Sequence, residues 1–152
     1  MICPFCSSDQ LQTKNTRPTR SFTQTWRRKE CLDCKNTFTT YETLDLSYLK
    51  VIKRSGKVQR YSRAKLFAGI YHSAIDTRMP DRGEAGTKAD KWTKEVEVRI
   101  TGLKKNTINS VEILNIVLEV LSKKSIDTFL HFLAYKEQDD NKKIIEYLKK
   151  YI

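Results

Sequence analysis

The sequence predicts an α+β protein in which a small, cysteine-bearing β module precedes a mostly helical domain with one short β-hairpin. Three observations lead to this prediction. Residues 1–45 contain all four cysteines and few aliphatic residues, so they need a staple in place of a core. Residues 48–61 contain two short β-prone runs around a Ser-Gly turn. Further along the chain, apolar residues recur at helical spacing.

The composition indicates a phosphate-rich partner. Among 152 residues, 29 are Lys or Arg and 18 are Asp or Glu, which gives a formal net charge of +11. Such a surplus attracts polyanions such as nucleic acid. No stretch approaches the ~18 consecutive apolar residues of a membrane span, and the first residues, MICPFCSSDQ, lack a signal-peptide pattern. We therefore expect a cytoplasmic protein without a membrane partner.

The four cysteines form two C-x-x-C pairs, Cys3 with Cys6 and Cys31 with Cys34. Each pair brings two thiolates to about 4 Å from one another on one side of a metal, and two pairs complete the tetrahedron that structural zinc prefers. Zinc binding would also supply the folding free energy that residues 1–45 lack. The spacing predicts one Zn²⁺ per chain.

Two alternatives to zinc are iron, which four thiolates also bind, and a redox-active dithiol. A thioredoxin-type C-x-x-C follows a strand within a βαβ unit, and no residues precede Cys3 that could form that strand. His72 and His131 are not needed as ligands, and we expect both at the core edge or the surface.

Cations cluster around the second cysteine pair. Three consecutive cations precede Cys31, separated from it by Glu30, and two lie earlier in the spacer between the pairs: Arg17, Arg20, Arg27, Arg28 and Lys29. Folding about the metal is expected to gather them on one small surface suited to phosphate and base-edge contacts on DNA. The alternatives are a solvated charged face, or a zinc ribbon that binds RNA or docks on a protein.

The helical domain is expected to begin with the hairpin of residues 48–61, YLKVIKRSGKVQRY. Ser62 is a predicted N-cap for a helix with apolar residues at Leu66, Phe67, Ile70, Ala74 and Ile75. Residues 79–90, MPDRGEAGTKAD, combine one proline and two glycines with charges and predict a loop. A helix is expected next, with one apolar stripe formed by Trp92, Val96, Ile100 and Leu103.

Two further core helices and a tail are predicted. Ser110 is the expected N-cap of a helix with Glu112 in its first turn and apolar residues Ile113, Ile116, Val117, Val120 and Leu121. The segment IDTFLHFLAYKEQ predicts another helix that starts at Asp127 or Thr128. In the tail, one stripe serves either subunit contacts or docking on its own domain: Ile144, Leu148 and Tyr151.

A second phosphate-seeking feature lies in residues 51–66, VIKRSGKVQRYSRAKL. Lys53 and Arg54 flank the hairpin turn, and Lys65 falls in the first turn of the next helix, where the helix dipole also favours an anion. Three cations converging there suit a triphosphate, and a basic hairpin on the DNA-facing surface is the alternative. The sequence has no Walker or dinucleotide-binding glycine motif and no convincing catalytic constellation, so we do not expect an enzyme.

Taken in order, CPFC, NTRP, RRKECLDCKNTFTTYE and VIKRSGKVQRYSRAKL resemble the NrdR family, the transcriptional repressors of ribonucleotide reductase genes. The resemblance is dense over residues 1–75 and traceable from Ser110 to Lys136. The family joins an N-terminal zinc ribbon to an ATP-cone. By that resemblance, residues 1–45 are a DNA-binding zinc ribbon, residues 46–137 an ATP-cone and residues 138–152 a C-terminal helical tail.

The resemblance implies a nucleotide-responsive repressor rather than an enzyme. Its ribbon would bind operator boxes in double-stranded DNA upstream of ribonucleotide reductase genes, on the nucleoid, and its cone would bind ATP or dATP and control a homo-oligomeric state. The matching nucleotide-site positions are Val51, Lys53, Arg54, Lys65 and Ser110, and the matching basic positions of the ribbon are Arg17, Arg27, Arg28 and Lys29.

The chain departs from the family pattern at several positions. Trp26 and Thr37 stand where relatives usually carry arginine, and Gln59 stands where cones commonly carry glutamate. Near residue 130 the family pattern aligns in two ways, so no nucleotide contact is assigned to His131, Tyr135 or Lys136.

Overall fold

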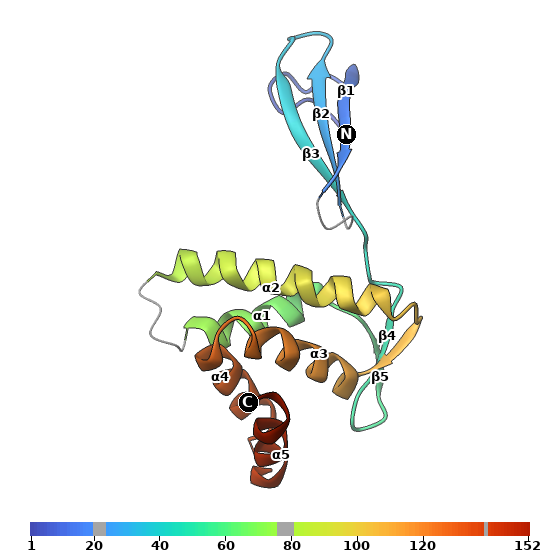
Figure 1. Ribbon diagram of the computed structural model, residues 1–152. Helices are drawn as coiled ribbons and strands as arrows, with labels where there is room; N and C mark the ends of the chain where they lie inside the picture. Colours follow the sequence, from blue (N-terminus) through green and yellow to red (C-terminus); the bar gives the residue numbers. More distant parts are fainter. Residues whose placement is uncertain (20–23, 76–80, 139) are drawn as a thin grey trace. The chain divides into compact units, whose positions relative to one another are not determined.

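A computed structural model describes residues 1–19, 24–75, 81–138 and 140–152, which form two compact units, Met1–Asp45 and Leu46–Ile152. The first unit is a β-sheet, and the second is mostly helical with a small sheet (Figure 1). The α+β prediction is therefore confirmed.

The first unit is a three-stranded antiparallel sheet. Its strands are β1 (Leu11–Pro18), β2 (Gln24–Cys31) and β3 (Thr37–Thr43), in the order β1-β2-β3. Cys3 and Cys31 are its only buried residues within the part that the structure describes. The described residues of this unit thus form no apolar core, as the sparse aliphatic content of residues 1–45 predicts.

The small sheet of the second unit is built around β4 (Lys50–Ile52). This strand pairs antiparallel with β5 (Val58–Arg60) and parallel with β6 (Thr107–Asn109). The predicted hairpin is confirmed, and Gly56, at φ +80°, supplies the left-handed residue of its turn. The strand β6 was not predicted, because its short polar segment shows no local β pattern.

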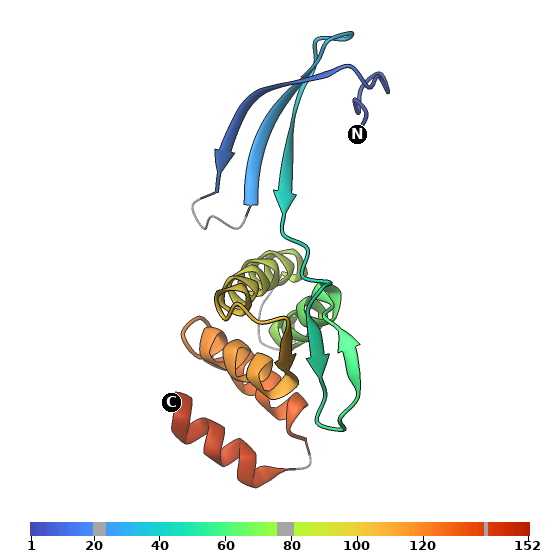
Figure 2. The ribbon, with the colours of Figure 1, turned by 90° about the vertical axis from the view of Figure 1, so that its right-hand side faces the viewer.

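The described residues of the second unit also form five helices: α1 (Arg63–Ile75), α2 (Arg82–Gly102), α3 (Ser110–Ser122), α4 (Ile126–Lys136) and α5 (Asn141–Tyr151). Helix α1 packs on α2 and α4, and α3 packs on α2 and α4, with the sheet beside them (Figure 2). Their shared core includes Ile70, Val96, Leu118 and Phe129, all fully buried. This packing places the β4–β5 hairpin next to the first turns of α1 and α3.

The predicted loop over residues 79–90 is wrong from Arg82 onward, where α2 begins, and its residues 79 and 80 lie outside the described part of the chain. The Asp81 carboxylate accepts a hydrogen bond from the Gly83 backbone N–H (2.8 Å) and caps the helix. Ala85 and Ala89 then face the core at helical spacing. A cap and two small buried residues outweigh the low helix propensity of the glycines.

The other predicted helix starts are close but not all correct. Ser62 caps α1 as predicted, through its hydroxyl and the Lys65 backbone N–H (3.4 Å). Ser110 is instead the first residue of α3, and Asn109 is the N-cap, with its N–H bonded to the Glu112 carboxylate (2.9 Å). Helix α4 begins at Ile126 rather than Asp127 or Thr128, because Ser125 is the cap.

The tail helix α5 docks on its own domain, which is one of the two expected alternatives. Ile144, Tyr147, Leu148 and Tyr151 pack against the core of the second unit. The Tyr151 hydroxyl also donates a hydrogen bond to a backbone carbonyl of α3, that of Asn115 (3.3 Å). Among the described residues, no helix is long and apolar enough to cross a membrane.

Candidate functional site

Four thiols converge at one end of the first unit, where the sequence places a metal site. The sulfur atoms of Cys3, Cys6, Cys31 and Cys34 all lie within 4.8 Å of one another. The Cys3–Cys34 and Cys6–Cys31 sulfur distances are 3.6 and 3.5 Å. A tetrahedral zinc with Zn–S bonds of about 2.3 Å holds its sulfurs about 3.8 Å apart. The four side chains therefore fit a zinc ion.

The two cysteine pairs are held by equivalent turns. The residue after the second cysteine of each pair is left-handed, Ser7 at φ 61° and Lys35 at φ 60°. Its N–H bonds to the carbonyl of the first cysteine of the pair, at 2.9 Å in the first turn and 3.0 Å in the second. The repeated geometry aims both thiols of each pair toward the same point, as a closed metal site requires.

Polar hydrogens surround the sulfurs and favour the thiolate form that a metal binds. The Phe5 backbone N–H donates to the Cys3 sulfur (3.4 Å), and the Asn36 side-chain amide donates to the Cys34 sulfur (3.5 Å). The Asn36 backbone N–H lowers the pKa of the Cys34 thiol to about 6. The Ser8 backbone N–H also lowers the pKa of Cys6, but hydrogen bonds to the neighbouring thiols and burial outweigh this effect and raise that pKa to about 12. Of these two thiols, Cys34 is therefore the first to ionise.

The cations of the ribbon lie on both faces of the sheet. Arg17 pairs across the sheet with Trp26, and the side chain of Arg28 points to this same face because it is two residues further along β2. Arg27 and Lys29 occupy the opposite face. The prediction that the cations gather on one surface is therefore wrong for the described residues, because strand alternation separates neighbours in the sequence.

Two of these cations already have partners on β3. The Arg27 guanidinium forms an ion pair with Glu42 (2.9 Å). Arg28 donates to the hydroxyls of Thr37 (2.6 Å) and Thr39 (3.3 Å). Thr37 thus helps to hold Arg28 against the sheet.

Arg17 and Lys29 form no ion pair with the residues that the structure describes. Within this described part, their charges are therefore available to an external anion without first breaking an ion pair. Arg20, the remaining predicted DNA contact, lies outside the described residues.

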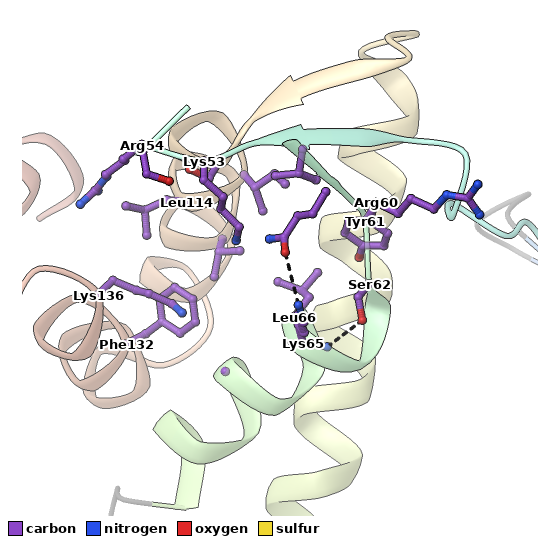
Figure 3. A pocket seen from close by; sticks show the side chains of 17 residues that line it. Lys53, Arg54, Arg60, Tyr61, Ser62, Lys65, Leu66, Leu114, Phe132 and Lys136 are labelled. Carbon is purple, nitrogen blue, oxygen red and sulfur yellow. Dashed lines mark hydrogen bonds between the residues drawn. The ribbon is translucent and has the colours of Figure 1, made fainter. Parts of the chain in front are cut away.

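A cavity of about 560 Å³ opens in the second unit between the β4–β5 hairpin and helices α1, α3 and α4 (Figure 3). This volume lies within the range typical of small-molecule sites. All five predicted nucleotide-site residues are among those that line it: Val51, Lys53, Arg54, Lys65 and Ser110. Residues far apart in the sequence therefore share one pocket.

Three lysines bring positive charge to this cavity. Lys53 comes from the hairpin, Lys65 from α1 and Lys136 from α4. Among the described residues, none of the three is paired with a carboxylate, and the nearest polar partner of Lys65 is the Gln59 side-chain oxygen (3.4 Å). Such a group of unpaired cations favours a polyanionic ligand.

Lys136 is a pocket residue that the sequence did not identify. Its ammonium lies 5.4 Å from the centre of the Phe132 ring and 4.9 Å from that of Tyr135. Burial against these neighbours lowers the pKa of Lys136, and the Lys53 ammonium lowers it further. The ambiguous family pattern near residue 130 hid this contact, whereas His131 and Tyr135 do not line the cavity.

The remaining wall is apolar with a few hydroxyl and amide groups. Its apolar residues include Val51, Leu66, Leu114, Val117 and Phe132, and Ser62, Gln59 and Ser110 add polar atoms. An apolar wall opposite a cluster of cations suits a ligand with a flat, weakly polar part and a multiply charged part.

Arg54 differs from the pocket lysines because it already has an acidic partner. Both of its terminal nitrogens donate to the Glu137 carboxylate, one of them at 2.9 Å. In Figure 3 the Arg54 side chain extends away from the space into which Lys53 points. The aliphatic part of the Arg54 side chain thus lines the cavity, while its guanidinium group is bonded to Glu137 outside it.

Comparisons with known proteins agree with this two-part architecture. Residues 1–42 match the model of the "Transcriptional repressor NrdR-like, N-terminal domain" and residues 49–151 match that of the "ATP cone domain". A "Transcriptional repressor NrdR" of Finegoldia magna is 30% identical over 151 residues, 99% of this chain and 97% of the relative.

Further relatives carry the same name. The protein of Caldicellulosiruptor bescii is 31% identical and covers 99% of this chain and 95% of itself. That of Trichodesmium erythraeum is 32% identical over 88% of this chain and 74% of itself. Repression of transcription is a non-enzymatic role, in agreement with the sequence prediction. The chain belongs to the NrdR family of transcriptional repressors.

Proposed function

We propose that this protein represses ribonucleotide reductase genes by binding operator boxes in double-stranded DNA, and that ATP or dATP controls this binding. The observation that supports the nucleotide response most directly is the cluster of three unpaired lysines opposite an apolar wall in the cavity of the second unit. Membership of the NrdR family supports the role in transcription.

In the proposed nucleotide complex, the phosphates lie among Lys53, Lys65 and Lys136. Lysine ammonium groups act as compact point charges that suit phosphate oxygens. The first turn of α1 adds backbone N–H groups near Lys65, and the Ser110 hydroxyl begins α3 on the other side of the cavity. The base then packs against the apolar wall that includes Val51.

The four cysteines are proposed to hold one structural zinc ion. Zinc supplies no reaction here; it cross-links the turns that contain Cys3 and Cys31 and thereby replaces the missing core of the first unit. A closed four-thiolate shell leaves no open position for a substrate, as is usual for structural zinc.

The zinc-stabilised sheet is proposed to contact DNA through its cations. Arg17 and Lys29 can bind phosphate without losing an ion pair to a described residue. Arg27 would have to break its ion pair with Glu42 before it could bind a DNA phosphate. Arg28 and Arg20 complete the set expected from the sequence. Because the described cations lie on two faces of a thin sheet, we propose that one strand edge enters a groove and each face meets one phosphate backbone.

Nucleotide control is proposed to act on assembly. The effector would shift an equilibrium between homo-oligomers, of which one presents the ribbons of residues 1–45 at the operator spacing. A nucleotide that bound every assembly equally could not change DNA affinity. Residues 46–137 would supply the nucleotide site, and the tail of residues 138–152 would supply subunit contacts beyond its own domain.

The experiment that tests this proposal combines calorimetry, native mass spectrometry and DNA retardation on the full chain. We expect ATP and dATP to bind, to change the mass of the assembly and to change retention of a duplex from a ribonucleotide reductase promoter. Lys65→Ala should abolish the dATP response, and the exposed Lys91→Ala in α2 should keep it. An undiminished response in Lys65→Ala would refute the proposed pocket.

An RNA of the same sequence as the promoter duplex separates DNA repression from RNA binding. We expect the duplex DNA to be retained and the RNA to be released at the same salt concentration. Equal or stronger retention of the RNA would refute the proposed partner.

A further inference from the structure

We propose that Arg54 and Glu137 are positioning residues, whose ion pair fixes the hairpin wall of the nucleotide pocket to the junction between α4 and α5. This inference rests on the proposed nucleotide site and assigns to Arg54 a role different from direct phosphate binding. By this inference Glu137, an acidic residue outside the cavity, strengthens the binding of an anion inside it.

The geometry of the pair is that of a built contact. Glu137 follows the last residue of α4, and its side chain is 1% exposed, against 46% for that of Arg54. Both Glu137 oxygens accept hydrogen bonds from Arg54, the bidentate arrangement in which arginine binds carboxylates best. These hydrogen bonds to Glu137 raise the pKa of Arg54.

The burial of Glu137 makes a transfer of Arg54 to a phosphate costly. If Arg54 turned into the cavity, a carboxylate without water access would lose its partner, and such losses are strongly destabilising. None of the three pocket lysines forms an ion pair with a carboxylate among the described residues, so binding a phosphate breaks no such pair. The direction of the Arg54 side chain in Figure 3, away from the cavity, agrees with this assignment.

The same pair is connected to the start of α5. The Asp140 backbone N–H bonds to the Glu137 carbonyl (3.0 Å), and the Asp140 side chain caps α5 through the Lys143 N–H (3.1 Å). Tyr147 of α5 lies near the pair: burial raises its pKa, and the Glu137 carboxylate raises it further. The hairpin, the end of α4 and the first turns of α5 therefore meet at Glu137.

The proposed role of the pair predicts a change in nucleotide affinity opposite to the one that charge alone predicts. Removing a negative charge near an anion site should strengthen nucleotide binding, and it should strengthen it further if Glu137 merely competes with phosphate for Arg54. If the pair instead positions the hairpin, the same change loosens the wall that holds Val51 and Lys53. Nucleotide binding then weakens despite the more favourable charge.

The test is ATP titration of the full chain in which Glu137→Gln is compared with Glu84→Gln. Glutamine is nearly isosteric with glutamate, and Glu84 is an exposed residue of α2 that does not line the cavity, so the control has the same change of charge. We expect Glu137→Gln to weaken ATP binding about tenfold and Glu84→Gln to leave it unchanged. Unchanged or stronger ATP binding by Glu137→Gln would overturn the inference.

Hydrogen exchange gives a second readout that a purely local defect would not change. In the wild type we expect ATP to slow exchange both in residues 50–60 and in α5. In Glu137→Gln the slowing in α5 should be absent, and its persistence would also overturn the inference. Failure of the wild type to bind ATP would refute the proposed function; the pair is then tested by nucleotide-free exchange, where Glu137→Gln must accelerate both segments.

Discussion

Replacing Lys136 with methionine removes one charge from the nucleotide pocket and little else. Methionine keeps most of the length of the side chain and its contact with the Phe132 and Tyr135 rings. A hydrogen bond to a charged group contributes about 1.5–3 kcal/mol, which corresponds to about 10- to 150-fold in affinity. Because Lys136 keeps part of its side chain in solvent, we expect a loss near the lower end, about tenfold.

The folded domain should tolerate this substitution. In the ligand-free pocket, burial and the neighbouring Lys53 both disfavour the charged form of Lys136, as the lowered pKa shows. Removing the charge relieves this repulsion, so the free energy of unfolding should stay constant or rise. In the wild type, a bound phosphate relieves the same repulsion between Lys136 and Lys53. We therefore expect Lys136→Met to lose nucleotide affinity while its free energy of unfolding is retained.

Calorimetry with ATP and dATP measures the affinity and a urea titration measures the free energy of unfolding, with the exposed Lys91→Met in α2 as a control for net charge. The pKa of Lys136 is lowered in the free protein and should rise beside a phosphate, so wild-type binding should take up protons at alkaline pH and weaken as pH rises. Lys136→Met should lose this dependence. ATP affinity within twofold of the wild type would refute the role of Lys136.

Three further predictions concern the metal, the DNA and the hairpin. Cys31→Ser should lose its zinc, as measured by atomic emission, and residues 1–45 should unfold. The helices of the second unit should remain, as measured by circular dichroism. A full zinc content in this variant would contradict the prediction. Lys29→Ala should weaken retention of promoter DNA and reduce the slope of log affinity against log salt by about 0.9, and an unchanged slope would remove Lys29 from the interface. Arg54→Ala should destabilise the second unit by about 1–2 kcal/mol, less than a fully buried pair because the Arg54 side chain is 46% exposed; an unchanged urea midpoint would show that Glu137 does not need Arg54.

Structural features formed by residues close together in the sequence, such as turns and hairpins, could be predicted. The C-x-x-C pairs place Cys3, Cys6, Cys31 and Cys34 in one cluster because each turn is local and the metal geometry joins the two turns. The β4–β5 hairpin follows equally from a Ser-Gly turn between β-prone runs. Caps are also set locally, and the errors at the starts of α3 and α4 are shifts of one or two residues, such as Asn109 in place of Ser110.

Features that depend on long-range packing were not predictable from local patterns. The polar strand β6 exists because β4 offers it a parallel partner, and a three-residue segment cannot reveal that partner. Helix α2 begins at Arg82 because Ala85 and Ala89 fit a closely packed core, against the local glycine signal. Lys136 lies in the pocket because α4 packs on α1, and the spacing of residues in the sequence does not predict this packing.

The contrast between Lys53 and Arg54 shows how far a sequence pattern specifies chemistry. The two residues are adjacent, both positively charged and both part of a hairpin associated with phosphate binding, so the pattern assigns them the same role. In the structure a buried carboxylate 83 residues away binds Arg54, while no carboxylate among the described residues binds Lys53. Charge alone therefore predicts that both cations attract phosphate, and the position of Glu137 decides which of them is free to bind it. A nucleotide site can thus depend on an acidic residue that never touches the nucleotide, because that residue holds the wall on which the binding cation stands.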